Sequence, residues 1–356
     1  HPDHRTIADF RKRFLEELAA LFTQVLLIAQ AMGLVKLGTV SLDGTKIKAN
    51  ASKHKALSWE HAKRLEEQLR GEVEELMRLA EQADNQPLPE QIDIPLELER
   101  REKRLAVIAT AKEEIEARAQ ARFEAEHAEY ERKLAARQAR AERTGKQPGG
   151  KPPKAPEPGP GAKDQVSLTD AESRIMPTAG GGFEQAYNAQ AGVDTETHLI
   201  VEQHVTDHSN DKQEVAPALE RLDALPEALG EVDALLADTG YHSAANLDRC
   251  EAAGIDAYIP ESRQRHNAPL AERLADDPPA PTGKPTPLEA NRHRLRTHMG
   301  KARYAKRKAT VETVFGIIKQ VQGFRQFLLR GLHAVQGEWA LVCLGWNLKR
   351  LFALKG

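Results

Sequence analysis

The chain has 356 residues, of which 40% are hydrophobic and 29% charged, and its formal net charge is −2 at pH 7. This length holds one large domain with insertions or two ordinary domains. The near-neutral charge excludes a uniformly basic protein, so any contact with nucleic acid must come from local patches. The sequence has no signal peptide and no apolar run of the roughly 18 residues that a membrane helix needs, and its two cysteines, Cys250 and Cys343, are far apart. We therefore expect a cytoplasmic chain with reduced thiols and no membrane contact.

The N-terminal segment, residues 1–37, is predicted to be helical. Apolar residues recur at three- and four-residue steps over 5–33, and a glycine follows them. Residues 38–56 are expected to hold the first strand of the domain, because residues 38–50 change to a period of two, in which apolar Leu42 alternates with polar Asp43, as in a half-buried strand. Asp43 is therefore expected on one face of a sheet.

Residues 57–143 differ in composition from the rest, being rich in Glu, Arg, Ala and Leu. Two helices are predicted, over 58–84 and 96–143, and the second would span about 70 Å at ~1.5 Å per residue. Apolar stripes indicate an antiparallel, coiled-coil-like helical hairpin. Residues 144–164 are rich in Pro, Gly and Lys and are predicted to be a linker without a core.

Residues 165–356 are predicted to supply the remainder of a compact α/β domain. In chain order we first expect two strands, over 183–194 and 198–207, and a helix from 209 to about 222. The apolar strand VDALLAD then ends in Asp238 and is followed by a helix over 243–253 and the strand IDAYIP. After a loop over 262–298 we expect a basic helix over 299–322, which carries Glu312, and an apolar final helix over 335–354.

This order of elements is that of the RNase H-like fold. Asp43 lies within the first strand, Asp238 at the end of a later strand, and Glu312 on a late helix. Ligands of open α/β sheets gather at the carboxyl ends of the strands. Three carboxylates meeting there can hold two Mg²⁺ or Mn²⁺ ions about 4 Å apart, which activate a nucleophile and stabilise the leaving oxygen at phosphorus. We predict an α/β, RNase H-like catalytic domain interrupted by a long helical hairpin.

Five blocks of the sequence resemble, in the same order, the successive blocks of a DDE transposase from a bacterial insertion sequence. They are LDGTKIKANAS (42–52), LTDAESRIMPTAGGGFEQAYNAQAGVD (168–194), LADTGYHS (236–243), RKATVETVFGIIK (307–319) and EWALVCLGWNL (338–348). The resemblance runs from about residue 2 to the C-terminus and is weakest in the helical hairpin and in 262–298. It implies that Asp43, Asp238 and Glu312 are the acidic triad that binds the catalytic metal ions.

Many members of that family carry a signature on the last helix: Tyr, two residues, Arg, three residues, Glu, six residues, Lys. Glu312 and Lys319 have the six-residue gap, whereas Arg307 sits one residue early, Lys308 takes the expected Arg position, and Tyr304 is shifted likewise. Lys308, Glu312 and Lys319 would then share one helical face. From the resemblance we expect DNA contacts at Lys319, Lys308, Arg307, Tyr304 and Lys46.

Each acidic residue also has an interpretation that involves no catalysis. Asp43 precedes a glycine and could belong to a tight turn. Asp238 could cap the helix that begins near Ser243, and Glu312 could pair with Lys308 at i,i+4.

Other polar and aromatic residues favour structural roles. Asp211 and Glu214 have the spacing of a capping box, which is the interpretation we favour. The histidines and tryptophans are more typical of ordinary structure than of a zinc site or a base-stacking surface; they are His204, His208, His242, Trp339 and Trp346.

The sequence thus predicts a DNA transposase that cleaves DNA at insertion-sequence ends and transfers strands. The resemblance implies double-stranded DNA as partner, a homodimer on paired ends, and a location in the bacterial cytoplasm with the nucleoid. An RNase H-like nuclease without strand transfer and a non-catalytic coiled-coil interaction protein remain alternatives. The chain begins at His1, inside a block that follows the family's N-terminal helices, so we expect a truncated N-terminal domain; an inactive remnant is a third alternative.

Overall fold

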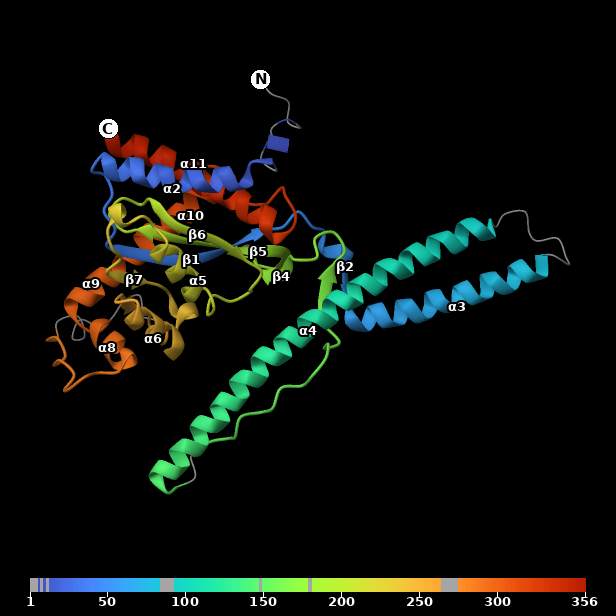
Figure 1. The fold of residues 1–356 in the computed structure, drawn as a ribbon, viewed down its shortest axis with the longest axis horizontal. Helices are drawn as coiled ribbons and strands as arrows, with labels where there is room; N and C mark the ends of the chain where they lie inside the picture. Colours follow the sequence, from blue (N-terminus) through green and yellow to red (C-terminus); the bar gives the residue numbers. More distant parts are fainter. Residues whose placement is uncertain are drawn as a thin grey trace. The chain divides into compact units, whose positions relative to one another are not determined.

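The computed structural model describes residues 6, 9–10, 13–83, 93–146, 149–178, 181–263 and 275–356. The chain divides into two compact units. The first comprises the described residues of 1–51 and 172–356, and the second those of 52–171 (Figure 1). Each unit has an apolar core of its own.

A mixed six-stranded sheet forms the centre of the first unit. Strand β1 (Thr39–Lys48) is antiparallel to β5 (Phe183–Asp194) and parallel to β7 (Ala234–Leu236), which is in turn parallel to β8 (Asp256–Tyr258). On the far side of β5 lie β4 (Arg174–Pro177) and β6 (Ile200–Thr206), which pair with successive parts of it. This strand order and these directions are consistent with an RNase H-like domain.

Helices cover the sheet and bury its strands. Helices α2 (Leu15–Ala31) and α11 (Leu332–Lys355) lie side by side, and α11 packs on β6 (Figure 1). The remaining helical segments of this unit are α5 (Val215–Asp223), α6 (Ala244–Ala252), α8 (Pro287–Arg294), α9 (His298–Arg307), the π-helix η4 (Lys308–Glu312), α10 (Thr313–Gln320) and the short turns η2 (Glu227–Leu229) and η3 (Thr239–Tyr241).

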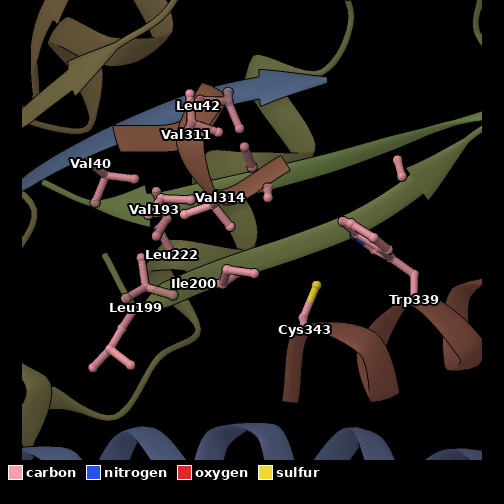
Figure 2. Packing of buried hydrophobic residues seen from close by; sticks show 14 of the residues in the cluster. Val40, Leu42, Val193, Leu199, Ile200, Leu222, Val311, Val314, Trp339 and Cys343 are labelled. Atoms are coloured by element: carbon pink, nitrogen blue, oxygen red, sulfur yellow. The ribbon is translucent and has the colours of Figure 1, made fainter. Parts of the chain in front are cut away.

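The core fixes the segment that carries Glu312 against the central strands. Val311 and Val314 pack beside Leu42 and Val193, so this segment contacts β1 and β5, while Trp339 of α11 faces β6 (Figure 2). The tryptophans Trp339 and Trp346 are buried, as expected, and both cysteines are buried free thiols.

The second unit is an antiparallel helical hairpin on a small two-stranded sheet. Helix α3 (Trp59–Ala83) and α4 (Ile94–Thr144) follow β2 (Ala56–Ser58) and the turn η1 (Lys53–Lys55), and β2 pairs with β3 (Gln165–Ser167). Ion pairs of 2.7 Å join Glu66 to Lys112 and Glu72 to Arg101, which shows that the helices run in opposite directions. Leu69, Ile108 and Ile115 fill the core between them. Beyond Ala119 helix α4 buries no side chain, as its polar composition suggested.

Among the described residues, the strands β2, β3 and β4 and the helix α8 were not predicted. β2, β3 and β4 have three or four residues each, too few for a recognisable period. The loop expected over 262–298 contains α8, which opens on a capping box between Thr286 and Glu289. Residues 264–274 of that loop, and most of the first turns of the helix expected over 5–33, lie outside the described residues. Within the described part of the chain, no helix is long and apolar enough to cross a membrane.

Candidate active site

Two of the predicted acidic residues lie at matching positions of neighbouring parallel strands, Asp43 within β1 and Asp238 just after the end of β7. Ser41 of β1 pairs with Leu236 of β7, and Asp43 and Asp238 each lie two residues beyond that pair. Asp238 accepts a hydrogen bond from the Gly240 amide at 2.7 Å and so caps η3, whereas Ser243 caps α6. Asp238 is therefore an N-cap, as the capping alternative stated, but it caps the turn η3 and not the helix α6.

The third acidic residue follows a change of helix type. Helix α9 ends at Arg307, and residues Lys308–Glu312 form a π-helix before α10 begins. A π-turn accommodates one residue more than an α-turn, so side chains five positions apart share a face. Tyr304 and Arg307 have the family's two-residue gap, and the extra residue before Glu312 is taken up by this π-helix. Arg307 is therefore the buried cation, and Lys308 is exposed, which corrects the expected placement of Lys308 at the Arg position.

Arg307 bridges the first and third acidic residues. Its Nη1 lies 3.1 Å from Asp43 Oδ2 and its Nη2 lies 2.9 Å from Glu312 Oε1. The Arg307 side chain is only 8% exposed. Residues from β1 and from the π-helix thus meet around one guanidinium, although they are remote in sequence.

The environment of Asp43 strongly disfavours an isolated negative charge. Burial raises the pKa of Asp43 to about 7, Arg307 opposes the shift, and the charges of Asp238 and Asp211 add to it. The hydrogen bond from the Gly44 amide, 2.8 Å long, favours the carboxylate. Asp43 therefore belongs to a cluster of negative groups that is only partly neutralised by the protein itself.

Two of the predicted basic residues lie along β1. Lys319 donates from Nζ to the Thr45 hydroxyl and, at 3.1 Å, to the Lys46 carbonyl oxygen. Burial and the nearby charge of Lys46 lower the pKa of Lys319. Lys46 itself pairs with Asp211 at 3.3 Å. Burial raises the pKa of Tyr304, and the neighbouring Arg307 opposes that shift.

The capping box predicted for Asp211 and Glu214 is wrong. Glu214 stands at the N-cap of α5 without a side-chain capping bond. Its two carboxylate oxygens instead contact His204 at 2.9 Å and His208 at 2.7 Å. Asp211 is directed at β1 and β5. The spacing was misleading because both side chains bond to other side chains, Asp211 to amides of β5 and Glu214 to two histidines.

Sequence reasoning missed a polar layer beside Asp43. Asn188 and Gln190 of β5 are buried and both donate to Asp211, and Tyr241 donates to Gln190. The two amides in this apolar strand were a signal for such a layer, because amide side chains in a strand that is buried on both faces need polar partners.

Residues 152–348 match the family model described as the transposase DDE domain. The chain belongs to this transposase family. Searches of curated proteins and of solved structures each found no match. The matched region of this DDE transposase includes Asp238, Glu312 and Lys319 but not Asp43. The position of Asp43 therefore rests on the pairing of β1 with β5 and β7.

DDE transposases generally use divalent metal ions, and the donors here suit such ions. Asp43, Asp238 and Glu312 offer the carboxylate oxygens that Mg²⁺ and Mn²⁺ prefer. Within the residues that the structure describes, no three acidic, histidine or cysteine side chains stand close enough to hold an ion as they are. Arg307 supplies positive charge between Asp43 and Glu312 instead. Asp43 and Glu312 thus already share one cation.

Proposed function

We propose that this transposase cleaves DNA at the ends of an insertion sequence and transfers the strands to a target, with Asp43, Asp238 and Glu312 as its catalytic residues. The observation that carries the proposal is the Arg307 bridge from Asp43 to Glu312, because it brings together acidic residues from distant segments. Asp238 follows β7, the strand that pairs with β1, by two residues.

The three carboxylates would hold two Mg²⁺ or Mn²⁺ ions. Such ions, when bound, polarise a water or 3′-hydroxyl and stabilise charge on the leaving oxygen. The chain's own part is to hold Asp43 within β1, Asp238 at the turn that follows β7, and Glu312 on a helical segment that packs against β1 and β5. Asp43 holds a proton readily when no added cation is present, since its pKa is about 7.

Double-stranded DNA would contact the basic residues near the triad. Lys308 is exposed, and Lys319 stands fixed beside β1. Arg307 and Lys46 are paired with carboxylates, so they would reach phosphate only by exchanging partners. Tyr304, next to Arg307, would complete this surface. We also propose that the protein acts as a homodimer on paired ends, as DNA cleavage at two ends requires two sites.

The test is cleavage of labelled linear DNA carrying the element's ends, with Mg²⁺ or Mn²⁺. The unaltered chain is expected to nick this DNA, and Asp43→Asn, Asp238→Asn and Glu312→Gln are each expected to reduce nicking by about 100-fold or more. An exposed carboxylate, Asp223 on α5, provides the matched control Asp223→Asn.

The products separate the proposed function from its alternatives. Joined donor and target strands support a transposase, whereas nicked DNA alone indicates a nuclease of the same fold. Equal activity with and without the three acidic side chains would overturn the assignment of the triad. Absence of divalent-dependent cleavage under all conditions would favour an interaction protein that uses α3 and α4.

A further inference from the structure

Asp211 occupies the centre of the polar layer beside Asp43. Its Oδ1 accepts hydrogen bonds from Asn188 Nδ2 at 2.7 Å and Gln190 Nε2 at 2.8 Å, and it lies 3.3 Å from Lys46 Nζ. The donors belong to β5 and β1, whereas Asp211 belongs to the segment before α5. One carboxylate therefore ties three parts of the chain together next to the acidic residues.

We propose that Asp211 is a positioning residue of the active site, which orients Gln190 and Tyr241 and thereby holds the turn that carries Asp238. This inference rests on the proposed function, because it concerns the same site. It adds a fourth acidic residue, whose part is to hold the turn that carries Asp238.

The Asp211 carboxylate determines the orientation of the Gln190 amide. A carboxylate only accepts hydrogen bonds, so Gln190 must turn its nitrogen toward Asp211. The Gln190 oxygen then faces the other way and accepts from the Tyr241 hydroxyl. Asn188 is turned in the same sense, although its Oδ1 is buried and has no partner among the described residues. The carboxylate thus determines how both amides of β5 are directed.

Tyr241 belongs to the same turn as Asp238. Tyr241 is fully buried, and its backbone amide donates to the Asp238 carbonyl oxygen at 3.2 Å. The Asp238 side chain caps the same turn at Gly240. Because the Tyr241 ring is anchored at Gln190, the turn that presents Asp238 cannot shift without breaking a buried hydrogen bond.

Close packing at two glycines shows how tightly this layer is built. A Cβ on Gly44, the residue after Asp43, would lie 2.1 Å from Gln190 Nε2 and 2.7 Å from Asp211 Oδ1. A Cβ on Gly240 would lie 2.9 Å from Asp238 Oδ1 and 3.6 Å from Asp211 Oδ2. Asp211 therefore fills the space between the backbone beside Asp43 and the backbone beside Asp238.

An amide at position 211 would disturb this arrangement. Asn has the shape of Asp but brings two donors, and Gln190 could then present its oxygen instead of its nitrogen. The Tyr241 hydroxyl would lose its acceptor, and the turn that carries Asp238 would no longer be held in place beside Asp43. Displacements of about 1 Å at such sites reduce rates by about 100-fold.

The experiment compares Asp211→Asn, Tyr241→Phe and the double variant in the nicking assay with Mg²⁺. We expect each single variant to lower kcat by about tenfold or more, with KM for DNA changed by less than about threefold. The double variant should be no worse than the poorer single variant, because both changes break one network. Asp223→Asn is the matched control, and a thermal melt of each variant checks its fold.

The outcomes separate this inference from the proposed function. If Asp43→Asn and Asp238→Asn abolish nicking while Asp211→Asn and Tyr241→Phe leave kcat unchanged, the positioning role is wrong and the triad stands. If Asp43→Asn and Asp238→Asn nick normally, the proposed function itself fails. If Asp211→Asn does not fold, Tyr241→Phe decides alone, since it removes a single hydroxyl. A rise in KM for DNA without a fall in kcat would also overturn the inference.

Discussion

His204 is a buried histidine enclosed by two carboxylates, and this arrangement determines how stability depends on pH. Its Nδ1 lies 2.7 Å from Glu202 Oε1 and its Nε2 lies 2.9 Å from Glu214 Oε2. Burial alone would lower the pKa of His204, but the two carboxylates raise it to about 9. Burial opposes the shift of Glu214 too, yet His204 and His208 lower its pKa to about 2.

We predict that the protein loses stability as pH rises from about 6.5 to about 9. The folded pKa of His204 lies above its unfolded value, so its contribution is complete below 6.5 and is lost as pH passes 9. Glu214 acts in the opposite sense, and its contribution is lost as pH falls from 4.5 toward 2. Thermal melts across this pH range measure both effects.

The control for this prediction is an exposed histidine. His54→Gln should keep the alkaline loss of stability, whereas His204→Gln should reduce it and lower the Tm at neutral pH, because the buried carboxylates of Glu202 and Glu214 then lose the cation between them, while Glu214 keeps His208. A Tm of the unaltered chain that stays constant from pH 6.5 to 9 would show that His204 is neutral in the folded protein.

At the scale of elements, the π-helix Lys308–Glu312 accommodates one residue more than a regular α-helix would have between α9 and α10. We predict that deletion of exposed Ala309 converts this segment to α-helix and keeps the site intact. Arg307 and Glu312 would then be four positions apart and would still share a face. Nicking activity should be retained, and the Tm should not fall.

A second deletion serves as the control. Gly316, in α10, is also exposed, but no π-turn compensates for its loss. Its deletion turns Lys319 by about 100° relative to Glu312 and should reduce nicking by about 100-fold. If deletion of Ala309 is as damaging as deletion of Gly316, the π-helix has a function of its own in positioning Arg307.

Elements with a long, regular pattern could be predicted from the sequence, and irregular ones could not. Strand 183–194 has the predicted bounds, and the two long helices differ from their predicted ends by one or two residues. The π-helix could not be predicted, because a one-residue insertion leaves no change in composition or period. The same irregularity made Arg307 look displaced from the family signature, although the structure places it against Asp43 and Glu312.

At the scale of the whole molecule, each unit has its own apolar core, and the residues that form one core do not contribute to the other. Lys48 and Arg174 pair with Ala186 from opposite sides of β5. They are therefore about 10 Å apart, two strand spacings. A short linker can span that distance once residues 52–171 are removed.

We predict that the first unit folds when residues 52–171 are replaced by a Gly-Ser linker of about six residues. Circular dichroism and a cooperative thermal melt are the measurements. Nicking assays on the same protein then show whether α3 and α4 contribute to DNA binding or to pairing of ends. A chain that aggregates, or melts without cooperativity, would mean that the second unit is needed for the first to fold.

Strand β1 is synthesised early, but its neighbours β5 and β7 follow only after the whole of the second unit has left the ribosome. The pairing of Ala56 with Ser167 closes that unit at its base. Once this local hairpin sheet has formed, the chain leading from β1 to β5 behaves as a short connection, because loop-closure entropy depends on the free length that remains. Folding of the second unit thus removes most of the loop-closure entropy cost that its length would otherwise add to the pairing of β1 with β5. Glu312 comes later still, so a nascent chain lacks the third acidic residue of the proposed site until η4 has been made.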